Sequence, residues 1–170
     1  MRTLPGTSAI RRALYTRLRD DPSMVTYIRS IGIARFYLGV LLAAMALGQL
    51  LSLPAFVEIV EEYRLGVLPS IAVAAVLLVL EVVAAVGLLA PRKTFPRLGE
   101  WAGLAVAVIW TLMAVQALAR GIELDNCGCF GAYLGQRLSG WILLQDAVFV
   151  ALAVFVVVRS STRRRWRASS

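Results

Sequence analysis

Four long stretches of the chain are apolar on all sides, and short polar segments separate them. They cover residues 31–53, 65–90, 101–119 and 139–158. At about 1.5 Å of rise per residue, each would span about 28 to 39 Å as a helix, enough to cross a hydrocarbon core of about 30 Å. A soluble bundle would instead carry polar residues along one face of each helix. The pattern therefore predicts an all-α fold, an integral membrane four-helix bundle.

The link at 54–64 has a different pattern. Its apolar residues Phe56, Ile59, Val60 and Tyr63 recur at three- and four-residue steps, and glutamates fill the other face. This spacing predicts a short amphipathic helix lying across the mouth of the bundle. We expect the helix to serve as a packed lid, and recognition of a substrate is the alternative.

Composition supports the membrane assignment. Hydrophobic residues make up 59% of the chain and the mean hydropathy is +0.76, whereas soluble domains are roughly half apolar. No repeat or second composition type divides the chain. We expect a basic N-terminal segment at 1–30, one four-helix domain at 31–158 and a basic tail at 159–170.

The net charge of +8 is unevenly distributed, which indicates a membrane topology and not nucleic-acid binding. Of the 18 basic residues, all but Arg64, Arg120 and Arg137 lie in or near the two termini and the 91–100 link. The positive-inside rule then predicts that both termini and the 91–100 link are cytoplasmic. The links at 54–64 and 120–138 face outward. The basic termini can bind anionic lipid, and residues 8–19 are either an interfacial helix or a disordered leader.

Both cysteines, Cys127 and Cys129, lie one residue apart in the second outward link, and the chain has no histidine. Cysteines at i and i+2 have Cα atoms at most about 7 Å apart, near the upper limit for a disulfide. Gly128 between them permits the turn that a bond requires. So small a ring would add little stability and would be easily reduced. The spacing therefore favours thiol–disulfide exchange over a structural bridge.

Two other interpretations of the pair stay open. Two thiolates can hold a soft ion such as Cu(I) or Hg(II), so Cys127 and Cys129 are also candidate metal ligands. Structural zinc would need two further ligands, which this chain lacks unless it dimerises. The pair could also be a passive structural turn.

Four polar residues of the apolar stretches fall at a similar predicted depth on the cysteine side: Gln49, Gln116, Gln145 and Asp146. Such residues are costly in lipid and tend to face the bundle interior or a wet cavity. We expect a polar pocket beneath the cysteines. Asp146 is its candidate proton acceptor or donor, because a thiol must ionise before it attacks. The alternative is that the four side chains only bond neighbouring helices.

Two charged residues lie deeper in the apolar stretches. Glu81 falls in the inner half of the second stretch, and Arg35 enters from the cytoplasmic side of the first. Buried charges in a membrane are usually paired, and long basic side chains can also extend to the interface. We expect a structural Arg35–Glu81 ion pair in preference to a proton path.

The string Cys127-Gly128-Cys129-Phe130-Gly131, between a third helix and an acidic fourth helix, resembles the MauE branch of the MauE/DoxX membrane proteins. The link from Pro54 to Pro69, followed by Glu81, resembles the DoxX pattern. The resemblance covers about 31–158. It implies a four-helix redox-associated protein that assists disulfide formation in a secreted enzyme subunit, beside a thioredoxin-like partner.

On this resemblance, Cys127 and Cys129 match the cysteine positions of the family and Asp146 its acidic position. A basic residue often precedes that acid in the family, whereas Gln145 stands here. Nothing in the sequence indicates that methylamine dehydrogenase is the secreted enzyme whose disulfide formation this chain would assist.

The sequence and the resemblance thus predict a redox protein of the bacterial inner (cytoplasmic) membrane that exchanges electrons with a thioredoxin-fold partner on the outer face. It supports disulfide formation or maturation of exported proteins, and either cysteine is a candidate for first attack. No cofactor is evident, and re-oxidation by a quinone in the bundle rests on analogy of architecture alone. The alternatives are a soft-metal-binding membrane protein and a non-catalytic scaffold of a membrane redox complex.

Overall fold

The computed structural model describes residues 22–66, 68–91 and 96–168, and the regular structure of these ranges is entirely α-helical. The all-α prediction is therefore confirmed. The predicted interfacial segment at 8–19 lies outside the described residues. The helices, in chain order, are α2 (Pro22–Leu51), α3 (Leu53–Glu62), α4 (Ser70–Leu89), α5 (Pro96–Ala119) and α6 (Gly140–Ala168).

Four of these helices are long and apolar enough to cross a membrane. Within the described part of the chain, the candidate spans are Arg29–Leu51, Ser70–Leu89, Arg97–Ala119 and Gly140–Ser161. Large apolar side chains remain exposed along all four, as on Leu47, Val79, Leu112 and Val148. Exposed apolar side chains on every long helix are what lipid contact requires, since water would disfavour them. The protein is an integral membrane helical bundle.

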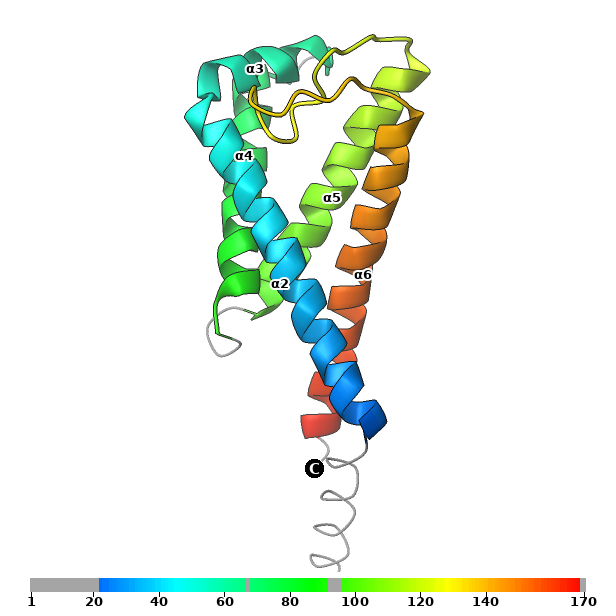
Figure 1. The fold of residues 1–170 in the computed structure, drawn as a ribbon. Helices are drawn as coiled ribbons and strands as arrows, with labels where there is room; N and C mark the ends of the chain where they lie inside the picture. Colours follow the sequence, from blue (N-terminus) through cyan, green and yellow to red (C-terminus); the bar gives the residue numbers. More distant parts are fainter. Residues whose placement is uncertain (1–21, 67, 92–95, 169–170) are drawn as a thin grey trace, which may run out of the picture.

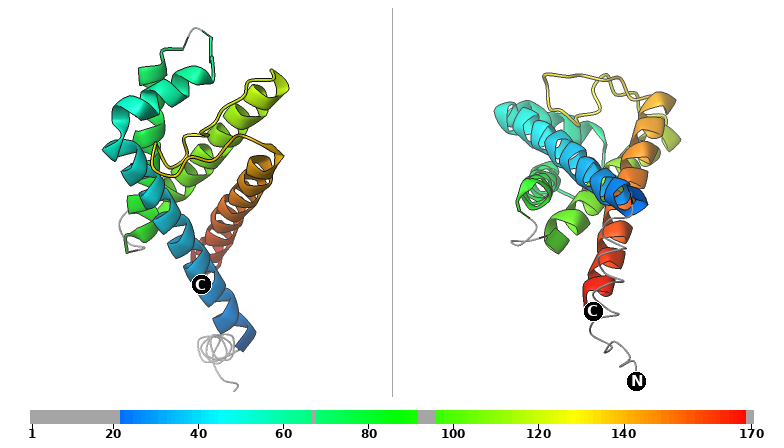
Figure 2. Two further views of the ribbon diagram at one scale, coloured as in Figure 1. Left: turned by 45° about the horizontal axis from the view of Figure 1, so that its top comes forward. Right: turned by 60° about the horizontal axis from the view of Figure 1, so that its bottom comes forward.

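The long helices pack in the order α2, α4, α5 and α6, and the contact that closes the bundle between α2 and α6 is smaller. Helix α3 and the loop at 120–139 lie together at one end of the bundle, which we call the loop end (Figure 1). The end of α4, the start of α5 and the C-terminal part of α6 lie towards the other end, the tail end. Helices α2 and α6 diverge towards the loop end, where the loop lies over the space between them (Figure 1, Figure 2).

The predicted amphipathic helix is present as α3. It starts after a break at Ser52 and carries a proline in its first turn, a position where the missing N–H costs nothing. Phe56, Ile59 and Val60 are buried, and Tyr63, which follows the helix, is fully buried. Helix α3 thus packs its apolar face onto the loop end of the bundle.

The long helices extend beyond the apolar stretches that revealed them. Helix α2 begins at Pro22, α5 begins at Pro96 and α6 continues to Ala168. The sequence pattern marks only the part of a helix that lies in hydrocarbon, because polar residues are free to continue the same helix in the headgroup region. The basic tail at 159–168 is therefore a continuation of α6.

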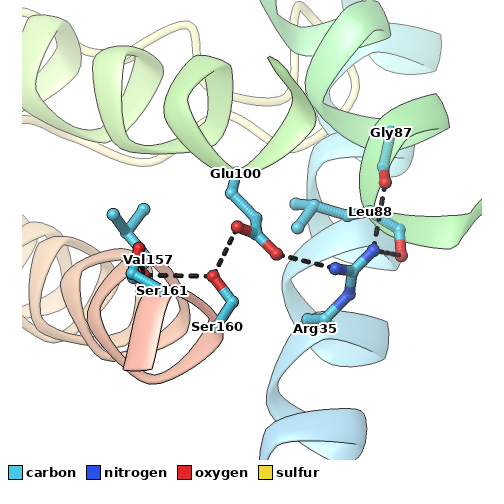
Figure 3. A network of polar contacts seen from close by, with 7 residues as sticks. All are labelled: Arg35, Gly87, Leu88, Glu100, Val157, Ser160 and Ser161. Carbon is cyan, nitrogen blue, oxygen red and sulfur yellow. Dashed lines mark hydrogen bonds and ion pairs between the residues drawn. The ribbon is translucent and has the colours of Figure 1, made fainter. Parts of the chain in front are cut away.

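A buried polar network joins all four long helices near the tail end (Figure 3). The Arg35 guanidinium of α2 lies 2.7 Å from a Glu100 carboxylate oxygen of α5 and donates to the carbonyls of Gly87 and Leu88 in α4. The Ser160 hydroxyl of α6 donates to the other Glu100 oxygen. Both charged side chains are almost fully buried, with 5% and 1% of their surface exposed. This network fixes the helices to one another.

The predicted Arg35–Glu81 pair is wrong, because Arg35 pairs with Glu100. Glu81 instead accepts hydrogen bonds from Gln49 and Trp110, nearer the loop end. Arg35 precedes Gln49 on α2 by 14 residues, which is about 21 Å of helix, so one acid cannot serve both. The sequence argument considered depth and overlooked the acid at the start of α5.

Candidate functional site

The loop at 120–139 is held by backbone hydrogen bonds across its two sides. The Cys127 N–H donates to the Gln136 carbonyl at 2.8 Å, and the Leu138 N–H donates to the Leu124 carbonyl at 2.9 Å. The Tyr63 hydroxyl, just after α3, donates to the Cys127 carbonyl at 2.8 Å. Helix α3 therefore anchors the loop at the first cysteine.

Asn126 shapes the turn that contains the cysteines. Its side-chain oxygen accepts from the Gly128 N–H at 2.9 Å, and its side-chain nitrogen donates to the Gly131 carbonyl at 2.9 Å. Gly128 and Gly131 have φ values of 82° and 65°, a region that favours glycine. Residues 126–131 thus form a compact turn in which the Asn126 side chain takes the place of backbone hydrogen-bond partners for Gly128 and Gly131.

The second half of this turn rests directly on α2. A Cβ atom on Gly131 would lie 2.5 Å from the Gly48 carbonyl oxygen, and one on Gly48 would collide with the Phe130 carbonyl. The Ser52 hydroxyl donates to the Gly48 carbonyl at 2.8 Å and accepts from the Ala132 N–H at 3.0 Å. The two glycines allow backbone to lie against backbone, which sets the height of the cysteines above the bundle.

The turn brings the two sulfur atoms together. Cys127 Sγ and Cys129 Sγ lie 3.4 Å apart as free thiols, within hydrogen-bond distance and longer than a disulfide bond of about 2.05 Å. Cys127 is 2% exposed, whereas Cys129 is partly exposed. The pair therefore has one sheltered and one more accessible member.

The shared hydrogen bond separates the acidities of the two thiols. The bond with Cys129 lowers the pKa of Cys127 to about 7, although burial opposes the shift. The same bond raises the pKa of Cys129 well above its usual value. Of the two thiols, Cys127 is therefore the one that loses its proton more readily.

A buried carboxyl lies beneath this turn. Gln49 donates to the Cys129 carbonyl and to Glu81, both at 3.1 Å, and the Trp110 ring nitrogen donates to the same Glu81 oxygen at 2.9 Å. Gln49 Oε1 and Glu81 Oε2 are buried without a hydrogen-bond partner in the described chain. Gln49 therefore links the cysteine turn to an acid in the middle of α4.

A cleft of about 360 Å³ opens beside the cysteines, between α2 and α6. Cys127, Cys129, Gln145 and Asp146 all line it. Asp146 is 8% exposed on the inner wall, whereas Gln145 is exposed. The negative charge of Asp146 raises the pKa of Cys127, which opposes the larger effect of the sulfur–sulfur bond.

The four polar residues predicted to form one pocket divide into three places. Gln145 and Asp146 line the cleft with the cysteines, and Gln49 reaches the Cys129 backbone without lining the cleft. Gln116 donates to the Tyr63 carbonyl at 2.8 Å and accepts from Arg120 at 3.0 Å. Similar depth on different helices does not mean that side chains face one another, since each helix has its own rotation.

Sequence reasoning gave no role to Asn126, and it assigned Tyr63 only to the apolar face of a lid. Asn126 precedes the cysteines directly, so its capacity to close an Asx turn was readable from the sequence. The Tyr63 hydroxyl contact depends on how α3 crosses the bundle, which no local pattern encodes. Among the described residues, no group of three or more His, Cys, Asp or Glu side chains could hold a metal ion.

Comparison with known proteins identifies the family. A sequence model described as methylamine utilisation protein MauE matches residues 27–159, which include the first three spans, most of the fourth and the cysteine turn. The chain belongs to the MauE family. It is 34% identical over 125 residues to methylamine utilization protein MauE of Paracoccus denitrificans, which covers 72% of this chain and 65% of that protein. No solved structure matches the chain significantly.

A second MauE, from Paracoccus versutus, is 35% identical over 123 residues, covering 71% of this chain and 64% of that protein. The alignments thus span slightly less than two thirds of the length of these MauE relatives. The segment matched by the family model contains Cys127, Cys129 and Asp146, as the resemblance of the CGCFG string implied.

Proposed function

We propose that this MauE-family chain is a membrane thiol–disulfide exchange protein. Its Cys127/Cys129 pair exchanges two electrons with a thioredoxin-fold partner on the extracytoplasmic side, and so supports disulfide formation in exported proteins. The observation that carries the proposal is the sulfur pair itself, 3.4 Å apart at the edge of an open cleft. A lowered pKa at Cys127 supplies the thiolate that such exchange requires.

The environments of the two sulfurs suggest an order of events. In the disulfide form, a partner thiolate attacks Cys129, because Cys129 is the partly exposed member. Cys127 leaves as the thiolate, since a thiol of lower pKa is the better leaving group. The second partner thiolate then attacks the mixed disulfide and releases Cys129. The chain gains two electrons as two thiols, and the partner loses them as it forms its own disulfide.

Charge distribution supports the orientation that this function needs. The basic residues at the start of α2, at the start of α5 and along the end of α6 lie away from the cysteine turn. For a protein of the bacterial inner membrane, the location that we propose, the positive-inside rule then favours cytoplasmic termini and outward-facing cysteines. The same basic termini are suited to contact anionic lipid.

The relatives are named for methylamine utilisation. That name applies to those proteins, and the residues of this chain do not specify the same client. We therefore propose only the class of client, an exported protein that acquires disulfides.

The test uses the oxidised full chain in detergent and a purified thioredoxin-fold protein whose second active-site cysteine is replaced by serine. This probe cannot resolve the mixed disulfide that it forms. After an acid quench and alkylation, fragment-ion mass spectrometry locates the probe on the chain. We expect a mixed disulfide at Cys129 and a free Cys127.

Other outcomes separate the alternatives. Stoichiometric Cu(I) binding that both Cys127→Ser and Cys129→Ser abolish, without any mixed disulfide, would support a soft-metal site. Absence of both metal binding and mixed disulfide would support a scaffold. Attack at Cys127 would retain the exchange function and overturn the order of events.

A further inference from the structure

The cleft between α2 and α6 connects the cysteines to the outside of the bundle at membrane depth. Its inner wall holds buried side chains, including Met45, Trp110 and Ile142. Its mouth holds Leu144 and Val148, which are 53% and 62% exposed. Because both mouth residues lie within the Gly140–Ser161 span, the mouth faces the acyl chains. A lipid-soluble molecule can therefore reach the sulfurs without entering water.

The lining suits a flat ring with polar substituents. Aromatic residues stand at the mouth, where Tyr37 and Trp141 are 61% and 65% exposed, and Phe149 lies between the helices. Aromatic side chains favour stacked or edge contacts with a second ring. Gln145 and Asp146 are the polar residues that α6 contributes. A volume of about 360 Å³ falls within the roughly 300–1,000 Å³ usual for small-molecule sites.

We propose that this cleft binds the headgroup of a membrane quinone, which re-oxidises the Cys127/Cys129 dithiol. The inference rests on the proposed exchange function, because a pair that oxidises its partner must pass two electrons onward. A quinone is a lipid-soluble two-electron acceptor, and its ring matches the apolar walls and aromatic mouth. An acyl chain would match the walls as well, but it has no use for the polar residues or the adjacent sulfurs.

The electron and proton balance closes with these groups. Cys127, as the thiolate, and Cys129, as the thiol, form one sulfur–sulfur bond and release two electrons. The quinone ring takes both electrons and becomes a quinol after its two oxygens receive two protons. One of those protons comes from the Cys129 thiol, and the other left Cys127 when it ionised. Asp146, whose carboxyl lines the cleft, can accept the Cys127 proton and pass it to a quinone oxygen.

The experiment uses the reduced full chain in detergent micelles and decylubiquinone as the probe. Every ring carbon of this quinone carries a substituent, so a thiol has no free position for addition. Loss of quinone absorbance gives the rate, and intact-mass spectrometry confirms that the protein loses two hydrogens. The same chain is oxidised in parallel by glutathione disulfide, which tests exchange without a quinone site.

The decisive variant is Val148→Trp, which fills the mouth of the cleft from a lipid-exposed position. Its matched control is Val79→Trp, because Val79 is 61% exposed on α4 and does not line the cleft. We expect Val148→Trp to slow oxidation by decylubiquinone about tenfold or more, equivalent to about 1.4 kcal/mol, and Val79→Trp to leave the rate unchanged. Oxidation by glutathione disulfide should be the same in both variants.

Three results overturn the quinone site. The first is oxidation by glutathione disulfide without oxidation by decylubiquinone, which leaves the exchange function standing. The second is an equal quinone rate in both tryptophan variants, which places the reaction outside the cleft. The third is failure of both oxidants in the wild type, which removes the exchange function and this inference with it.

Discussion

The bundle contains two buried polar clusters that differ in how completely their groups are partnered. Near the tail end, Arg35, Glu100 and Ser160 form a closed network whose charges neutralise one another inside the protein. Near the loop end, Gln49 and Glu81 keep one oxygen each without a partner in the described chain. There the thiols adjoin an open cleft.

On the proposed function, the difference separates the groups that stabilise the fold from those that react. A buried ion pair with further hydrogen bonds is demanding in geometry and holds helices in one register. Incompletely partnered groups beside a cleft are poor structural elements, but they leave acceptors and a thiolate free to react. We therefore expect changes near the tail end to alter stability, and changes near the loop end to alter thiol reactivity.

The largest predicted effect is that of Arg35→Met at the closed network. This change removes the buried guanidinium that lies 2.7 Å from the Glu100 carboxylate, and we expect a loss of about 3–5 kcal/mol in the free energy of unfolding. Denaturant titration in mixed micelles measures this loss. The pH dependence of Cys127 alkylation in the remaining folded protein should not change.

The control for Arg35→Met is Arg137→Met. Arg137 is 69% exposed and pairs with two exposed acids of the loop, so its loss should not measurably affect unfolding. Equal stability of the two variants would contradict the structural role assigned to the buried network.

The next effect concerns the contact between the loop and α2. Gly131→Ala puts a Cβ atom 2.5 Å from the Gly48 carbonyl at a backbone φ of 65°, so we expect a loss of about 2 kcal/mol in stability. We also expect faster alkylation of Cys127, because the turn must lift from the helix. Gly135→Ala on the same loop is the control, since its Cβ would have only ordinary contacts. If both variants behave alike, the glycine contact does not set the position of the turn.

A smaller effect is expected at the hydroxyl that anchors Cys127. Burial and the neighbouring thiols raise the pKa of Tyr63, so its hydroxyl stays a donor across physiological pH. Tyr63→Phe removes only this donor and should reduce stability by about 0.5–1.5 kcal/mol. Tyr133→Phe, at an exposed site, should have no effect. If Tyr63→Phe leaves the free energy of unfolding unchanged, α3 does not anchor the loop through this bond.

The smallest effect is a shift in the pH dependence of alkylation. Thiolate forms as pH rises through the pKa, so Cys127 should reach half its maximal alkylation rate near pH 7, below the value of about 8.5 for a free cysteine. Cys129→Ala removes the thiol that can donate to the ionised Cys127, so the midpoint should move upward. Cys129→Ser keeps a hydroxyl donor, so the pH midpoint of this variant should be lower than that of Cys129→Ala. If the wild type and Cys129→Ala have the same midpoint, the sulfur–sulfur hydrogen bond does not set the pKa of Cys127.

Much of the fold was predictable because lipid imposes a uniform requirement on each span. The four spans, the amphipathic α3 and the adjacency of Cys127 and Cys129 follow from composition and spacing. The partners of Arg35, Gln116 and Glu81 did not follow, because they depend on the rotation of one helix against another. Asp146 was expected in a pocket beneath the cysteines and lines the cleft beside them, whereas only the tertiary fold shows that the Tyr63 hydroxyl supports the cysteine turn.

The central claim is that Cys127 and Cys129 interconvert between dithiol and disulfide as one unit. The direct measurement equilibrates the purified full chain in glutathione buffers of graded potential, traps free thiols with acid and alkylation, and reads the intact mass. The account predicts reversible loss and recovery of two hydrogens in a single two-electron transition. Independent addition of glutathione to each cysteine, or a pair that stays unoxidised across the whole series, would contradict it.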